Sequence, residues 1–94
     1  MEAERLLRLP DTEQQMGKKR NALYEDISEG VFPPGVPLSF DKNGRPAAVA
    51  WPQSEVQAII RARIAGKSLD ELRSLVRALV AKRQQSDQRE PVAA

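Results

Sequence analysis

The chain contains no cysteine and no histidine among its 94 residues. The lack of cysteine excludes a disulfide framework, a cysteine nucleophile and a thiolate zinc site. The lack of histidine removes the usual general base at neutral pH and the commonest metal ligand. Carboxylates alone can bind a metal ion, but the sequence shows no clustered spacing for such a site. The composition therefore favours binding over catalysis, and we expect neither an enzyme nor a bound cofactor.

Long apolar runs are missing as well. The longest uninterrupted one is the five-residue segment Ala47–Trp51, whereas a membrane span needs about 20 residues. The first five residues include two acids, and no long apolar stretch follows them, which is not typical of a signal peptide. Together these features predict a protein of the reducing cytoplasm that does not enter a membrane.

The charge is balanced overall but uneven along the chain. Fifteen basic residues against 13 acidic ones give a net charge of +2, which alone does not indicate a nucleic-acid-binding protein. Residues 1–30 hold five basic and seven acidic residues. The cluster Lys18-Lys19-Arg20 lies within this otherwise acidic segment.

The first third of the chain predicts two short helices. Asp11–Gln14 has the pattern of a capping box after an extended segment, and it predicts a helix that runs to Met16. Gly17 ends this helix, because glycine adopts the left-handed conformation that a helix end requires. A second helix is expected over residues 18–29, with Gly30 at its end. Two helices joined by a glycine turn form a helix-turn-helix pattern.

The middle of the chain predicts a β-hairpin. Apolar residues alternate on both sides of a turn, as half-buried strands require: Val36, Leu38 and Phe40 before it, Val49 and Trp51 after it. The Asn43-Gly44 dipeptide predicts a type I′ turn. Pro37 and Pro46 favour edge strands, so we expect a two-stranded ribbon that is not part of a large sheet. The single tryptophan, Trp51, is expected to anchor the core.

Two more helices are expected after the hairpin. The first begins near Pro52, has an apolar stripe, and ends at Gly66. That stripe consists of Val56, Ile59, Ile60 and Ile64. A second capping box, Ser68–Glu71, opens a helix that runs to about Gln85.

The last helix has apolar residues at 3-4-3 spacing: Leu69, Leu72, Val76 and Leu79. This stripe either packs on the domain as core or forms a dimer seam, and its two heptads favour packing within the chain. We therefore divide the chain into a DNA-binding winged helix-turn-helix at residues 1–65, an amphipathic helix at 66–86 and a disordered tail at 87–94. The fold class is mainly α with a β-hairpin.

The predicted start of the second helix carries the candidate site. Lys18, Lys19 and Arg20, followed by Asn21, would lie at the positive end of the helix dipole, which costs about 0.3–1 kcal/mol per cation. None of the three cations has an acidic residue four positions later. A DNA phosphate would reverse this penalty, because the backbone N–H groups and the side chains would all face one anion. The alternative is a solvated basic patch.

Three further residues are candidates. Tyr24 lies one turn after Arg20 and either contacts a phosphate or sugar or packs at the edge of the core. Lys42 and Arg45 flank the tip of the hairpin. A basic ribbon can follow the DNA backbone or enter a minor groove, and the alternative is a turn made soluble by its charges.

Several segments together resemble the AlpA family of prophage regulators, which includes excisionase-like proteins. These segments are Leu6–Pro10, Gly17 with Arg20, Leu23-Tyr24, Glu29–Pro33, Val49–Trp51 and Ser54–Val56. The resemblance implies a MerR-like winged helix that binds DNA, in which Arg20 and Tyr24 match positions of the recognition helix. It also implies a role in activating the recombination genes of a mobile element, or as a recombination directionality factor. The sequence departs from the family's pattern at Lys18 and Lys19 and in its longer hairpin.

Two functions follow from the sequence. The first is a sequence-specific regulator that binds double-stranded DNA, as a homodimer or a cooperative array, beside an integrase. The second is an adaptor whose C-terminal helix recruits an integrase or a transcription partner, with DNA contact secondary.

Overall fold

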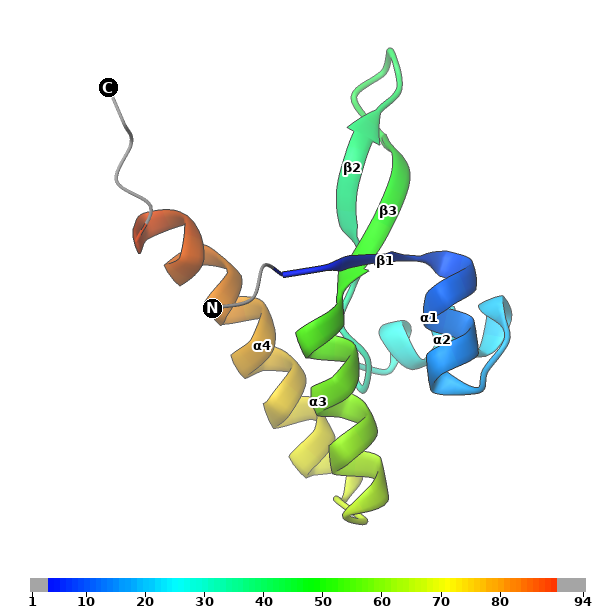
Figure 1. Ribbon diagram of the computed structural model, residues 1–94, viewed down its shortest axis with the longest axis vertical. Helices are drawn as coiled ribbons and strands as arrows, with labels where there is room; N and C mark the ends of the chain where they lie inside the picture. Colours follow the sequence, from blue (N-terminus) through cyan, green and yellow to red (C-terminus); the bar gives the residue numbers. More distant parts are fainter. Residues whose placement is uncertain (1–3, 90–94) are drawn as a thin grey trace.

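A computed structural model describes residues 4–89, which form four helices and three short strands (Figure 1). In chain order these are β1 (Leu6–Arg8), α1 (Leu9–Met16), α2 (Arg20–Ser28), β2 (Val36–Phe40), β3 (Pro46–Pro52), α3 (Gln53–Ile64) and α4 (Leu69–Arg89). The expected mixture of helices and a hairpin is confirmed.

Helix α1 begins three residues earlier than predicted. Arg8 is its extended N-cap residue, and Pro10 lies in the first turn, where a missing N–H costs nothing. The predicted capping box is wrong, because the N-cap residue is Arg8 instead of Asp11 and no side chain caps the helix. Thr12 is completely buried, and its hydroxyl donates to the carbonyl of Arg8 at 3.0 Å. Gly17 ends the helix as predicted, with a φ of 69°.

Helix α2 begins two residues later than predicted. Lys18 belongs to the turn, and Lys19 is the extended N-cap residue, with φ −80° and ψ 166°. Leu23 is fully buried on the inner face of α2. Gly30 follows the helix with a φ of 80°. The turn and the two helices give the helix-turn-helix arrangement that the sequence predicts.

The sheet has three strands in the order β1-β3-β2. The prediction of two strands is wrong, although the hairpin is not part of a large sheet. Strand β1 pairs antiparallel with the inner end of β3, with Leu7 opposite Trp51. Pro46 does not prevent this pairing, because it is the first residue of β3 and lies outside the part that β1 contacts. Pro37 lies in the edge strand β2, as expected.

The turn of the hairpin also differs from the prediction. Type I′ requires two positive φ angles, but Gly44 alone has one in this turn, at 82°. The Asp41 carboxylate instead accepts hydrogen bonds from the backbone N–H groups of Asn43, at 2.8 Å, and Arg45, at 3.0 Å. The Gly44 N–H donates to the Asp41 carbonyl. This is a three-residue loop with glycine at its left-handed position.

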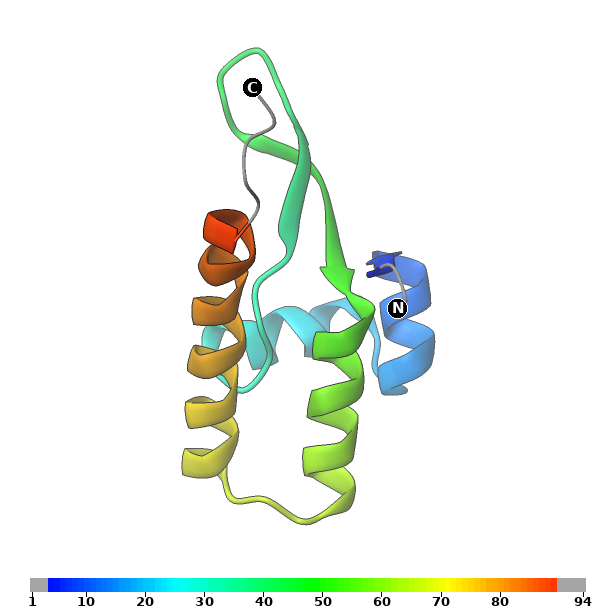
Figure 2. The same cartoon turned by 60° about the vertical axis from the view of Figure 1, so that its left-hand side comes forward.

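The hairpin extends well beyond the helices (Figures 1 and 2). Leu38 and Phe40 are therefore exposed, contrary to the expected half-buried alternation. Val36, nearer the base of the hairpin, is half-buried. The pairing of β2 with β3 is irregular between Pro37 and Phe40, and this irregularity also interrupts the predicted period of two.

Trp51 lies in the centre of the core, as predicted. Its side chain is fully buried, and its indole N–H donates to the Pro33 carbonyl at 2.9 Å. The Phe32 ring packs against it at 6.2 Å between centroids. The other buried members of this cluster are Leu7, Leu23, Val56, Ile59 and Val76.

Helix α4 packs alongside α3 (Figure 2), so the apolar stripe of α4 contributes to the core of the same chain, as favoured. Leu72 and Val76 are buried. Ile64 and Leu69 are exposed, contrary to prediction, since they lie at either end of the turn around Gly66. The α4 capping box is confirmed: the Ser68 N–H donates to the Glu71 carboxylate, and the Glu71 N–H donates to the Ser68 hydroxyl.

A partly buried ion pair joins α4 to α3. The Arg83 guanidinium donates to both carboxylate oxygens of Glu55, at 2.6 and 2.9 Å, and to the Pro34 carbonyl. Helix α4 continues to Arg89, beyond its predicted end. Residues 90–94 of the expected tail lie outside the described residues.

Candidate nucleic-acid interface

The start of α2 presents three exposed polar side chains, those of Lys19, Arg20 and Asn21. No side chain caps this helix end, so backbone N–H groups of the first turn point out of the helix without a partner from the cap residue. Within the part of the chain that the structure describes, neither Lys19 nor Arg20 forms an ion pair. The arrangement therefore suits an anion.

The ring of Tyr24 contacts the Arg20 side chain. The Arg20 guanidinium lies 5.9 Å from the centre of the Tyr24 ring, within the range of a cation–π contact. The Tyr24 ring packs edge-on against Trp51, 6.5 Å away, and Tyr24 remains 41% exposed. Tyr24 is thus an aromatic residue at the edge of the core that also contacts Arg20.

Lys18 is not a free cation, which corrects the prediction for this residue. Its Nζ atom lies 2.6 Å from Oδ2 of Asp26, and the two side chains are 35% and 11% exposed. Arg63 of α3 approaches the same oxygen at 3.7 Å. The prediction considered partners four residues away along a helix, whereas the turn before α2 brings together two residues that are eight apart.

Asp26 is a residue whose role the sequence analysis missed. It is buried between Leu23 and Ile27, on the inner face of α2. By joining Lys18 in the turn to Arg63 in α3, it fixes the start of α2 against the rest of the fold. An acid on the apolar face of the predicted helix was the signal that could have identified it.

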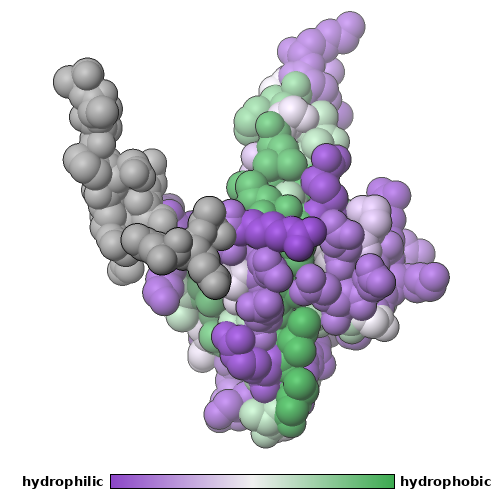
Figure 3. Space-filling view, viewed as in Figure 1, coloured by the Kyte–Doolittle hydropathy of each residue, from purple (hydrophilic) through white to green (hydrophobic). Residues whose placement is uncertain are grey.

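The second basic feature is the tip of the hairpin. Lys42 and Arg45 are both exposed there, on a loop that the Asp41 carboxylate holds in place. Figure 3 shows a hydrophilic tip above a more apolar stem. The structure brings Arg20 and Tyr24 into contact, but it places Lys42 and Arg45 in a separate part of the molecule, on the projecting hairpin.

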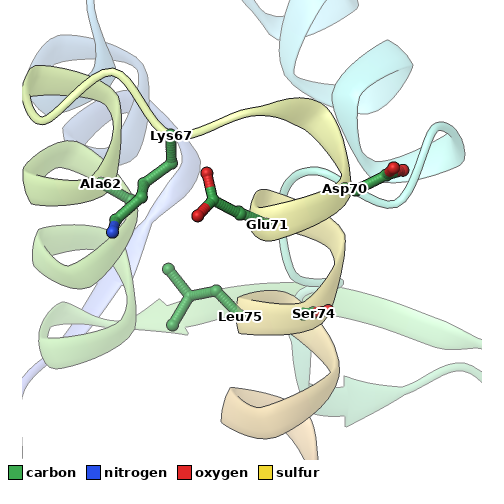
Figure 4. Close-up of a pocket in the computed structure, with 6 residues that line it drawn as sticks. All are labelled: Ala62, Lys67, Asp70, Glu71, Ser74 and Leu75. Carbon is green, nitrogen blue, oxygen red and sulfur yellow. The ribbon is translucent and has the colours of Figure 1, made fainter.

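A pocket of about 510 Å³ lies between α3 and α4, near their connecting turn. Its lining residues are Ala62, Lys67, Asp70, Glu71, Ser74 and Leu75. Lys67, Glu71 and Leu75 extend into the space between the helices, and Asp70 points away (Figure 4). The hydrogen bonds from Ser68, together with the charge of Lys67, lower the pKa of Glu71.

Residues 4–89 contain neither a cluster of metal ligands nor a membrane-spanning helix. No group of three acidic residues there is placed to hold a metal ion. No helix formed by residues 4–89 is long and apolar enough to cross a membrane.

Comparisons with known proteins identify the family of the chain. Residues 5–64 match the family described as prophage CP4-57 regulatory protein (AlpA). The uncharacterized protein ORF88 of Enterobacteria phage P4 is 45% identical over 64 residues, which cover 68% of this chain and 66% of that protein. The match thus spans just under two thirds of that relative's length. No solved structure matches the chain significantly. The family match covers the helix-turn-helix, the hairpin and α3, and the chain belongs to the AlpA family of prophage regulatory proteins.

Proposed function

We propose that this protein is a sequence-specific regulator that binds double-stranded DNA of a prophage or integrative element through a MerR-like winged helix. The proposal rests on the position of Arg20. It is an exposed arginine whose guanidinium lies over the Tyr24 ring, at a helix start that no side chain caps. The regulatory family supplies the biological setting.

In this proposal the first turn of α2 enters the major groove, as in other helix-turn-helix proteins. Arg20 makes a bidentate contact with a guanine, and Asn21 contacts an adjacent base. Lys19 and the backbone N–H groups bind a phosphate. The exposed acids Glu25, in the second half of α2, and Glu29, directly after its end, would face the phosphates on deeper insertion, so insertion is limited to the first turn.

The hairpin acts as the wing, with Lys42 and Arg45 at its tip contacting the DNA backbone next to the site of α2. One module of this size forms a small interface with DNA. Useful affinity therefore requires a dimer or a cooperative array on repeated sites.

The regulator acts as a transcriptional activator, as a recombination directionality factor beside an integrase, or as both. A footprint on DNA flanking its own gene separates these outputs. Protection of an attachment site supports excision, and protection of a promoter supports transcriptional control.

The direct test is Arg20→Ala in a gel-shift titration on the protected DNA. Loss of a bidentate guanine contact weakens specific binding by about 1–3 kcal/mol. Arg77→Ala is the matched control, because Arg77 is an exposed arginine on α4, away from the proposed interface. Equal binding by the two variants would refute the assignment of Arg20. A flat dependence of log K on log salt would count against phosphate contacts.

The C-terminal helix favours a second candidate function, recruitment of an integrase or a transcription partner. Arg83 hydrogen-bonds to Glu55 of α3 and to the Pro34 carbonyl, and α4 continues for six residues after it, to Arg89. Removal of α4 as a whole would take Leu72 and Val76 out of the core, so the useful truncation ends at Gln84. Retained DNA binding with loss of activation or excision would support recruitment.

A further inference from the structure

Phe40 is an exposed aromatic residue in a chain that has only four. It is 62% exposed, whereas Phe32 and Trp51 are buried and Tyr24 packs against the core. Phe40 lies opposite Pro46, on the last pair of residues before the tip of the hairpin. The pairing of the strands shifts between Ser39 and Phe40, and such irregularities commonly redirect a side chain.

The surroundings of Phe40 are ordered and positively charged. Asp41 accepts two backbone hydrogen bonds within the loop, and its own N–H donates to the Arg45 carbonyl at 2.8 Å. Phe40 is therefore held at the base of a fixed tip. Lys42 and Arg45 lie on the same tip, so the exposed ring has cations on its outer side. Apolar surface continues below it along the hairpin (Figure 3).

We propose that the Phe40–Pro46 pair is an apolar wedge that enters the minor groove of DNA and partly unstacks one base step. This inference rests on the proposed function and extends it to the mechanism of the hairpin. A two-stranded ribbon, with about 4.8 Å between its strands, enters a minor groove about 6 Å wide only if the groove widens. Insertion of an apolar side chain between bases widens the groove and kinks the duplex.

The chemistry of the pair suits this role. The Phe40 ring is flat and can stack on a base, and Pro46 has no N–H that would lose its water partners. Lys42 and Arg45 would bind the phosphates that a kink brings toward the tip. A second copy of the chain fits the surface less well. Leu38 and Phe40 together offer far less area than the roughly 800 Å² per partner of a stable protein interface.

The test compares full-length wild type, Phe40→Ala and Leu38→Ala on a duplex of about 30 bp taken from the footprint beside the protein's own gene. Dyes at the two ends report bending by energy transfer, and 2-aminopurine placed at successive steps reports unstacking. We expect wild type to bend the duplex by about 20–90° and to raise 2-aminopurine fluorescence at one step. Phe40→Ala should lose most of both signals and bind about fivefold or more weakly. Leu38→Ala, an exposed apolar residue farther from the tip, should retain both signals.

The outcomes separate the wedge from the proposed function. Arg20→Ala should weaken affinity but keep the bend at saturating protein. If Phe40→Ala bends and unstacks the duplex like wild type, or if wild type does neither, the wedge is refuted while DNA binding stands. A third outcome is that wild type self-associates in sedimentation, and that Phe40→Ala loses both the self-association and the bend. In that case the hairpin docks on another copy of the chain, and the wedge is again refuted. If wild type binds no DNA, both proposals fail.

Discussion

Two neighbouring lysines should respond in opposite ways to substitution by alanine. Lys18 forms a half-buried ion pair with Asp26, whereas Lys19 is exposed and has no ion pair among the described residues. Lys18→Ala should therefore lower stability and leave the salt dependence of DNA binding unchanged. Lys19→Ala should leave stability unchanged and reduce that salt dependence.

The size of the stability effect follows from the exposure of the pair. Breaking a fully buried ion pair costs about 3–5 kcal/mol, and an exposed pair contributes at most about 1 kcal/mol. Lys18 is 35% exposed, so solvent screens part of the interaction, and Arg63 still faces Asp26 at 3.7 Å after the substitution. We expect a loss of about 1–2 kcal/mol, where each 1 kcal/mol lowers Tm by about 4–8 °C in a domain of this size.

Thermal unfolding and a gel-shift titration across salt concentrations measure the two effects. Lys19→Ala should reduce the slope of log K against log salt by about 0.9, the value for one phosphate contact. Asp26→Asn is the control for stability, because it breaks the same ion pair without removing a cation. If Lys18→Ala leaves Tm unchanged and reduces the salt slope as Lys19→Ala does, then Lys18 faces DNA and the structural assignment is wrong.

Three other substitutions test the framework that positions the interface. Arg83→Ala should destabilise the fold by about 2–4 kcal/mol in urea unfolding, because it leaves Glu55 buried without its partner, and Arg83→Lys should restore only part of the loss. Trp51→Phe should cost about 1–3 kcal/mol in the same assay, since the buried carbonyl that accepts from the indole loses its donor; a neutral result would contradict the hydrogen bond. Glu71→Gln should weaken the dependence of the free energy of unfolding on pH in the acid range. The pKa of Glu71 in the folded protein lies below its ordinary value of 4.5. The ionised carboxylate therefore contributes to stability above pH 4.5, and this contribution is lost as the pH falls through the lowered pKa. An unchanged acid limb would mean that the capping contact with Ser68 does not form in solution.

Local signals in the sequence predicted much of the fold. Gly17 and Gly30 mark helix ends because each adopts a positive φ, and glycine does so at low cost. The Ser68–Glu71 capping box involves residues three apart and forms as predicted. Trp51 was identified as a core residue from its size alone. Each of these predictions depends on a residue's own conformational preference or on near neighbours.

Features that depend on distant parts of the chain were not predictable in this way. Strand β1 has only three residues, which is too short for an alternating apolar pattern to be recognised in the sequence. It forms a strand because its backbone pairs with the inner end of β3. The same holds for the candidate site. Arg20 is exposed at a helix start, where the sequence placed it, but the contact of Lys18 with Asp26 depends on the path of the turn. Binding of DNA by these residues remains a prediction.

Strand β3 has a further consequence for how the hairpin can vary. Its inner end, around Trp51, has partners on both sides, whereas its outer end, around Pro46, pairs with β2 alone. Extra residues near the tip would thus disturb no contact of the core. Adding two residues to each strand keeps every side chain on its original face and lengthens the hairpin by about 6.8 Å. Such proteins can therefore differ in how far the hairpin projects from the core while the rest of the fold stays intact.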